Sequence, residues 1–187
     1  MRKAPILVLS IAIAAASACA PQPHERRPRA EHDDDDGQMH KGVAQADQWL
    51  SVEGFGARVR VPKGWEYGTQ GPLVLGTEAQ SRAAFLFVGA GSVADAKKKY
   101  QIGLDLLKMD LGASSLDKRS VVLHGLAFER QDYAKATVAG RPAHGVALVG
   151  DAPGGRHELL LFLGYSLDGE PDLDKQLAAA IESISQE

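Results

Sequence analysis

The chain of 187 residues carries 21 lysines and arginines against 24 aspartates and glutamates, which gives a net charge of −3 at pH 7. This balance argues against a nucleic-acid-binding protein, because such proteins need a clustered basic surface. The single cysteine excludes an internal disulfide, so in an oxidising compartment the fold must depend on its hydrophobic core.

Residues 1–18 have the layout of a secretory signal peptide. Arg2 and Lys3 form a basic start, residues 6–16 are apolar, and small residues occupy positions 16–18. A transmembrane helix needs about twenty apolar residues, whereas this run is shorter and is soon followed by Pro21. We therefore predict that residues 1–18 are removed on export, which changes the net charge from −3 to about −5.

Cys19 directly follows the tripeptide Ala16-Ser17-Ala18. This junction resembles the lipobox of bacterial lipoproteins, in which the cysteine is acylated and becomes the new N-terminus. The resemblance implies an anchor of three acyl chains on Cys19, palmitate among them, and Ala20 in place of aspartate implies an outer-membrane protein facing the periplasm or the cell surface. The lipobox usually has leucine at the position of Ala16, and the tripeptide also suits ordinary signal peptidase, so simple secretion is the alternative.

Residues 19–48 differ in composition from the rest of the chain. They are rich in proline and charge and hold scarcely any large apolar side chain, so they cannot offset the entropy cost of ordering. We predict a disordered, lipid-anchored linker over residues 19–48 and a globular domain over residues 49–187. His24, His32 and His40 lie around a run of aspartates, but a specific metal site needs fixed geometry. We therefore predict a charged spacer and no metal ligands.

The first half of the globular domain shows three strand patterns and a helix. Strands are predicted at residues 55–61, 72–76 and 83–88 from alternating or continuous apolar residues. Ser92 and Asp95 form a helix-capping signal, and Gly112 is the predicted end of the helix. Gly103 lies inside it and is expected to weaken it by about 1 kcal/mol. The predicted apolar stripe consists of Val93, Ala96, Tyr100, Leu104, Leu107 and Leu111.

The second half reads as four strands and a closing helix. The strands are predicted at residues 121–128, 133–138, 143–149 and 157–165, and the short Gly- and Pro-containing gaps predict antiparallel hairpins. The closing helix begins at Pro171, with an apolar stripe of Leu173, Leu177, Ala180, Ile181 and Ile184. The order βββ-α-ββββ-α predicts an α+β fold with one mostly antiparallel sheet of six to seven strands, covered on both faces.

Two segments carry a resemblance to a known group of folds. FGARVRVPKGW at 55–65 and FERQDYAKATVAGRPAHGVAL at 128–148 resemble the corresponding segments of PsbP-like and DcrB-like proteins. The resemblance implies an α/β/α sandwich and an accessory or binding role. Members include extrinsic photosystem subunits, small envelope lipoproteins and a Ran-binding import factor, and they share no catalytic residues.

The segment from Gly89 to Ala94 reads G-x-G-x-x-A between a predicted strand and a predicted helix, as in dinucleotide-binding proteins. Because hairpins follow it rather than further parallel crossovers, we interpret it as a turn with a helix cap and expect no nucleotide or other cofactor. Trp65 is predicted to lie in the core rather than on a binding surface. The lysines at 97–99 are expected to be a solvated helix face.

A catalytic site could be built only from scattered residues. The chain has no G-x-S-x-G, no H-E-x-x-H and no cysteine pair, which argues against a nucleophile elbow and a zinc site. The rival hypothesis of an envelope enzyme requires convergence in a deep pocket of at least two residues from a set of five, with Ser166 as the nucleophile that a histidine would serve. The set is His124, His144, His157, Asp151 and Asp168.

We therefore expect an exported, lipid-anchored cell-envelope protein that is not an enzyme and whose domain binds an envelope protein partner. The alternatives are the enzyme just described and a purely structural surface lipoprotein. A binding protein should expose a contiguous apolar area, which a structural protein need not do.

Overall fold

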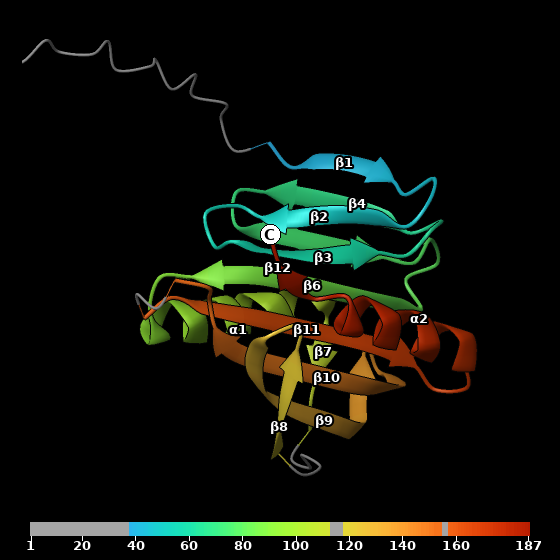
Figure 1. Cartoon of the computed structure of the whole chain (residues 1–187). Coiled ribbons are helices and arrows are strands. Elements are labelled where there is room, and N and C mark those ends of the chain that lie inside the picture. The colour runs from blue at the N-terminus through green and yellow to red at the C-terminus, as the bar shows by residue number, and fades with distance from the viewer. Residues whose placement is uncertain (1–37, 113–117, 155–156) are drawn as a thin grey trace, which may run out of the picture. The chain divides into compact units, whose positions relative to one another are not determined.

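The computed structural model describes residues 38–112, 118–154 and 157–187. Within these ranges the chain forms two helices and twelve strands (Figure 1). The strands before the first helix are β1 His40–Val43, β2 Gln48–Val52, β3 Ala57–Val61, β4 Glu66–Gln70, β5 Leu73–Thr77 and β6 Ala83–Ala90. The elements that follow are α1 Val93–Leu107, β7 Met109–Asp110, β8 Lys118–Leu123, β9 Leu126–Val138, β10 Arg141–Asp151, β11 Leu159–Leu167, α2 Pro171–Glu182 and β12 Ser185–Gln186.

The main sheet has nine strands in the order β1-β4-β5-β6-β11-β10-β9-β7, with β8 also paired to β9. Neighbouring strands are antiparallel, and the register places Leu163 opposite Leu86 and Phe162 opposite Phe87. Every residue of β6 is buried, as are all but the first of β11. The prediction that these two apolar runs are central strands covered on both faces is therefore confirmed.

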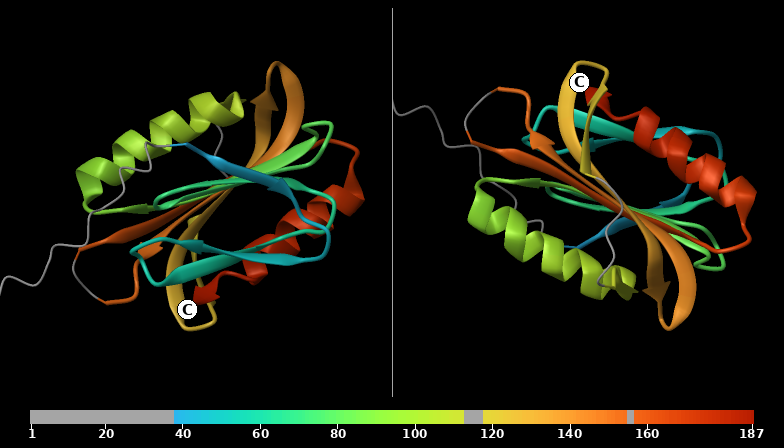
Figure 2. Two further views of the ribbon diagram at one scale, coloured as in Figure 1. Left: turned by 90° about the horizontal axis from the view of Figure 1, so that it is seen from above. Right: turned by 90° about the horizontal axis from the view of Figure 1, so that it is seen from below.

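Helix α1 covers one face of the main sheet, and α2 covers the other together with a small sheet of order β12-β3-β2 (Figure 2). On the α2 side the rings of Phe85 and Phe162 stack with centroids 5.3 Å apart, and Trp65 lies 6.1 Å from Phe85. Trp65 is 2% exposed, which confirms its predicted place in the core. Its Nε1 donates a hydrogen bond to Gln176 Oε1 of α2 at 2.7 Å, so the indole N–H is satisfied.

The α+β class and the mostly antiparallel sheet with two packed helices are confirmed, but the predicted count of six to seven strands in one sheet is wrong. The strand at β3 belongs to the small second sheet. Strand β4 reads EYGTQ and shows little apolar alternation, yet it is hydrogen-bonded between β1 and β5. The single strand predicted at 121–128 is a hairpin, because His124 and Gly125 adopt φ values of 45° and 87° and turn the chain.

Helix α1 ends at Leu107 rather than before Gly112. Lys108 adopts a left-handed conformation with φ 53°, and Met109 and Asp110 then pair with β9 as a strand. Val93, placed in the predicted apolar stripe, is 60% exposed. Gly103 has a role beyond weakening the helix. A Cβ there would lie 2.7 Å from Leu163 Cδ1 and 2.9 Å from a Leu86 methyl, so the glycine lets the helix approach the sheet.

The linker predicted over residues 19–48 is too long at its C-terminal end. His40–Val43 forms β1 at the edge of the main sheet, β2 begins at Gln48, and Ala44 between them is 1% exposed. A short polar edge strand buries little apolar surface, and its composition therefore resembles that of a linker. The signal peptide at 1–18, Cys19, His24 and His32 lie outside the described residues. Within the described ranges, neither helix is long and apolar enough to cross a membrane.

Candidate functional site

Two of the five residues proposed for an enzyme come together. His144 of β10 places Nε2 3.6 Å from Asp168 Oδ1 and Nδ1 4.0 Å from Asp174 Oδ1. Asp174, in the first turn of α2, was not among the predicted residues, and it accepts a short hydrogen bond from the hydroxyl of Ser166. The register explains the convergence, because Ser166 of β11 lies directly opposite His144.

The other three candidates lie elsewhere. Asp151 ends β10 opposite Leu159, at the far end of the strand pair from His144, and His157 precedes the same end of β11. His124 lies in the β8–β9 turn, where its Nε2 is 2.9 Å from the carbonyl oxygen of Glu182. Sequence reasoning could not separate the two groups, because the distinction depends on strand register.

The hydroxyl of Ser166 donates its hydrogen bond to the Asp174 carboxylate rather than to the imidazole of His144. The arrangement therefore differs from the usual serine–histidine pair, in which the histidine base lies within about 2.6–3.2 Å of the hydroxyl. His144 is 57% exposed in its side chain, and the adjoining hollow holds only about 160 Å³. Among the described residues, no group of three His, Cys, Asp or Glu side chains could hold a metal ion.

The glycine-rich segment before α1 is a packing and capping device. The position of a Cβ on Gly89 is occupied by the ring of Phe55. The Gly91 N–H donates to the Asp95 carboxylate at 3.0 Å, and the Asp95 N–H donates to Ser92 Oγ at 3.2 Å. Lys99 hydrogen-bonds the Asp95 carboxylate and thereby lowers its pKa, so a negative charge already occupies this helix N-terminus. The geometry agrees with the interpretation as a turn with a helix cap.

A second feature is a groove beside α1. The helix packs against β6 and β11 and leaves the neighbouring strand β5 only half covered. We define the α1 groove by Leu73 and Leu75 of β5 on one wall and Ile102 and Leu106 of α1 on the other. Ile102 and Leu106 are 50% and 48% exposed. The middle of this groove is a hollow of about 260 Å³ lined by Gln70, Pro72, Leu73, Leu86, Val88, Lys99, Ile102 and Leu106.

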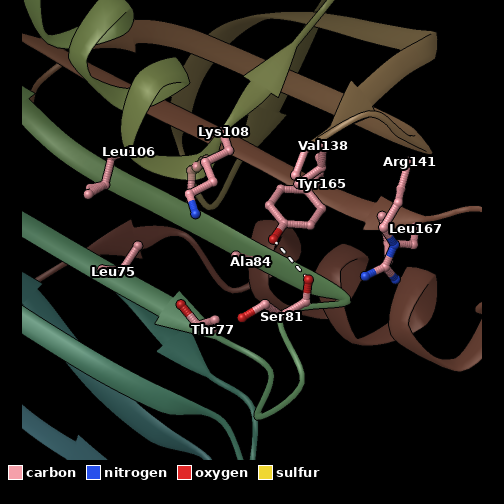
Figure 3. Close-up of a pocket in the computed structure, with 12 residues that line it drawn as sticks. Leu75, Thr77, Ser81, Ala84, Leu106, Lys108, Val138, Arg141, Tyr165 and Leu167 are labelled. Carbon is pink, nitrogen blue, oxygen red and sulfur yellow. Dashed lines mark hydrogen bonds between the residues drawn. The ribbon is translucent and has the colours of Figure 1, made fainter.

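At the C-terminal end of α1 the groove opens into a larger hollow of about 340 Å³ (Figure 3). Lys108 and Arg141 extend their side chains into this space, and the buried Tyr165 donates its hydroxyl hydrogen to the Ser81 carbonyl at 3.1 Å. We call this space the cationic hollow. Its lining residues are Leu75, Thr77, Ser81, Ala84, Leu106, Leu107, Lys108, Val138, Ala139, Arg141, Tyr165 and Leu167.

The backbone around the cationic hollow is held in an unfavourable conformation. Five described residues other than glycine have positive φ, and three of them, Ser81, Lys108 and Ala139, line this one hollow. Left-handed backbone costs a non-glycine residue about 1–3 kcal/mol, and such residues cluster at ligand-binding sites. Backbone hydrogen bonds hold Lys108 in place: its N–H donates to the carbonyl oxygens of Asp105, at 3.2 Å, and Leu104, and its own carbonyl accepts from the Ala139 N–H at 3.0 Å.

Near the cationic hollow, Arg82 forms ion pairs with carboxylates, whereas the two cations that line the hollow do not. Arg82 hydrogen-bonds the Glu78 carboxylate and so holds the pKa of Glu78 below its ordinary value, and it also reaches Glu170 at 3.2 Å. Within the described part of the chain, neither Lys108 nor Arg141 forms an ion pair. Arg82 therefore balances one of the two carboxylate charges of Glu78 and Glu170, and Lys108 and Arg141 make this group of five charges net positive.

Sequence reasoning missed this site. Ile102 and Leu106 fall outside the predicted apolar stripe of α1, although their spacing of four residues is itself a helical signal. Lys108 was assigned to the interior of a longer helix. Lys108 lies at the helix end because the next residue, Met109, pairs with β9, a contact that the local sequence does not indicate.

No family model matches the sequence, and no curated protein matches it. Among solved structures, the solution structure of cyanobacterial PsbP (CyanoP) from Synechocystis sp. PCC 6803 is similar, with a TM-score of 0.50 and 15% identity over 78% of this chain and 95% of that one. LpqN, involved in cell envelope biogenesis of Mycobacterium tuberculosis, is 18% identical over 81% of this chain and 85% of its own, with a TM-score of 0.36. The likeness to CyanoP shows the fold, which confirms the expected PsbP-like architecture.

Proposed function

We propose that this chain is an exported, lipid-anchored cell-envelope protein whose folded domain binds a ligand or partner without catalysing a reaction. The observation that carries the proposal is the position of the only cysteine, directly after a signal-peptide pattern. A protein anchored by two or more acyl chains stays on its membrane, while one chain gives only marginal binding.

The geometry of the domain supports binding rather than catalysis. Ser166 directs its hydroxyl to Asp174 and not to a histidine, and this supports a non-catalytic role because a serine nucleophile is usually activated by an adjacent histidine. The α1 groove and the adjoining cationic hollow provide a partly apolar, concave surface, and among the described residues Lys108 and Arg141 of the hollow form no ion pair. Pockets of this general kind are the usual places for small ligands.

The anchor is tested by expressing the full chain in a Gram-negative bacterium supplied with an alkyne-labelled palmitate. We expect label on the membrane-associated protein and a mature N-terminus at an acylated Cys19 in the mass spectrum. The Cys19→Ser chain should lose the label and appear in the soluble periplasmic fraction. An unacylated N-terminus at Cys19 or beyond, or an intact Met1, would overturn the anchor.

An enzyme remains the second candidate, because Ser166, His144 and two carboxylates are within one cluster. A fluorophosphonate probe tests it directly, since the probe labels only activated serines. We expect no labelling of the purified chain beyond the level of the Ser166→Ala variant. Labelling that disappears with both Ser166→Ala and His144→Gln would show a serine hydrolase and refute the proposed non-catalytic role.

A further inference from the structure

We propose that the α1 groove binds an amphiphile with an acyl tail and an anionic head group. The tail would lie between α1 and β5, and the head would lie in the cationic hollow beside Lys108 and Arg141. This inference deepens the proposed binding role, but it is independent of whether Cys19 carries lipid.

The tail part of the groove is apolar and half open. Leu73 and Pro72 face Ile102 and Leu106 across a hollow of about 260 Å³, and the floor is formed by Leu86 and Val88 of β6. Leu106 and Ile102 are about half exposed, although leucine and isoleucine on a helix facing a sheet are ordinarily buried. A flexible hydrocarbon chain would remove these side chains from water.

The head part of the groove attracts an anion. Lys108 and Arg141 enter the cationic hollow from the end of α1 and from the start of β10, and Thr77 adds a hydroxyl (Figure 3). An arginine guanidinium donates paired hydrogen bonds to a phosphate or carboxylate, and a lysine adds a compact positive charge. The protein retains Lys108 at a left-handed position that glycine would occupy at lower cost. An anionic ligand gives a physical reason for that choice.

One molecule can reach both parts. Leu106 lines the tail hollow and the cationic hollow alike. Leu73 and Leu75 are two residues apart on β5, so their side chains face the same side and lie about 7 Å apart along the strand. A tail of a few carbon atoms therefore bridges the two spaces.

The groove suits an acyl chain better than a peptide. Strand β5 is hydrogen-bonded to β4 on one side and to β6 on the other, so it has no free edge with which a peptide backbone could pair. An extended peptide in the tail hollow would leave its own N–H and C=O groups without partners among apolar side chains, which is unfavourable. A hydrocarbon tail has no such groups.

The test uses the full chain with Cys19→Ser, purified without detergent, and dodecyl phosphate below the concentration at which it forms micelles. Calorimetric titration should show saturable binding at one site. Lys108→Asn together with Arg141→Gln should weaken binding by about tenfold, because two charge contacts are lost. Asn suits the left-handed conformation, so this variant keeps the helix end intact. The matched control, Lys97→Gln with Lys98→Gln, removes two charges from the exposed side of α1 and should change affinity less than about twofold.

The remaining arms separate head, tail and other occupants. Inorganic phosphate and dodecyltrimethylammonium should each bind at least about tenfold more weakly than dodecyl phosphate, and Ile102→Gln with Leu106→Gln should also weaken binding. Equal binding of inorganic phosphate would show a free-anion site, and equal binding of the cationic amphiphile would show that charge is not recognised; either result overturns the proposal. The proposal is also overturned if the chain does not bind dodecyl phosphate and instead self-associates in a way that Leu106→Gln abolishes. Thermal unfolding of each variant confirms its fold. If dodecyl phosphate does not bind but Cys19 is acylated in cells, only the ligand proposal is wrong. If dodecyl phosphate binds but Cys19 is not acylated, only the lipid anchor is wrong.

Discussion

Replacing Gly103 by alanine should destabilise the domain, although alanine is the better helix former. In isolation the change favours a helix by about 1 kcal/mol. In the folded protein the new Cβ would lie 2.7 Å from Leu163 Cδ1 and 2.9 Å from Leu86 Cδ2. Those leucines are 0% and 2% exposed, so their methyl groups have little free space into which they could move. Adding a methyl group to a packed core costs about 1–3 kcal/mol.

The two effects together predict a net loss of about 1 kcal/mol in the free energy of unfolding. Urea unfolding followed by circular dichroism measures it, and the corresponding fall in Tm is about 2–4 °C for a domain of this size. Leu163→Ala by itself should destabilise by about 2–5 kcal/mol, and adding Gly103→Ala to it should cost less than it does in the wild-type chain. A Gly103→Ala protein more stable than the wild type would refute the close approach of α1 to the sheet.

Three further changes test other contacts. Gln176→Leu leaves the buried Trp65 N–H without its acceptor and should lower the free energy of unfolding by about 1–3 kcal/mol in urea; an unchanged midpoint would contradict the hydrogen bond. The Arg82 hydrogen bond lowers the pKa of Glu78 below its ordinary 4.5, so Glu78 contributes stability above that value that is lost as the pH falls through the lower folded pKa. The Tm of Glu78→Gln should therefore lie below that of the wild type at pH 7 and approach it in acid. A difference in Tm that stays constant with pH would exclude the linkage. Lys108→Gly should raise the free energy of unfolding by about 1 kcal/mol, because glycine adopts the left-handed conformation without strain. The same change should weaken the binding of dodecyl phosphate. A lower free energy of unfolding would show that Lys108 is not strained.

The parts of the fold that sequence reasoning predicted are those with a strong apolar signal. Strands β6 and β11 are continuous apolar runs, and α2 begins at a proline with acidic residues in its first turn and buries Leu173, Leu177, Ala180 and Ile181 as expected. Each of these signals is local, because burial on both faces or along one stripe is written directly into the order of residues.

The failures have a common physical cause, which is pairing with a distant segment. Strand β4 is polar and exists because β1 and β5 supply its hydrogen-bond partners. The helical spacing of α1 continues to Leu111, but Met109 pairs with Val138 of β9 instead. The cationic hollow combines Thr77, Lys108 and Arg141 from three separate elements, and no spacing in the sequence marks them as neighbours. Convergence of His144 with Asp168 also depended on register.

The short strand β1 is the edge strand of the main sheet and covers the outer side of β4. His40–Val43 occupies the outer side of β4, whose other side is taken by β5, so removal of those four residues would bare a row of amide and carbonyl groups. Bare borders of this kind invite pairing with foreign strands and the formation of aggregates. A recombinant fragment cut at residue 49 would expose the outer side of β4 and be prone to aggregate, whereas one beginning at residue 38 would keep the short, lysine-bearing strand β1 as its edge.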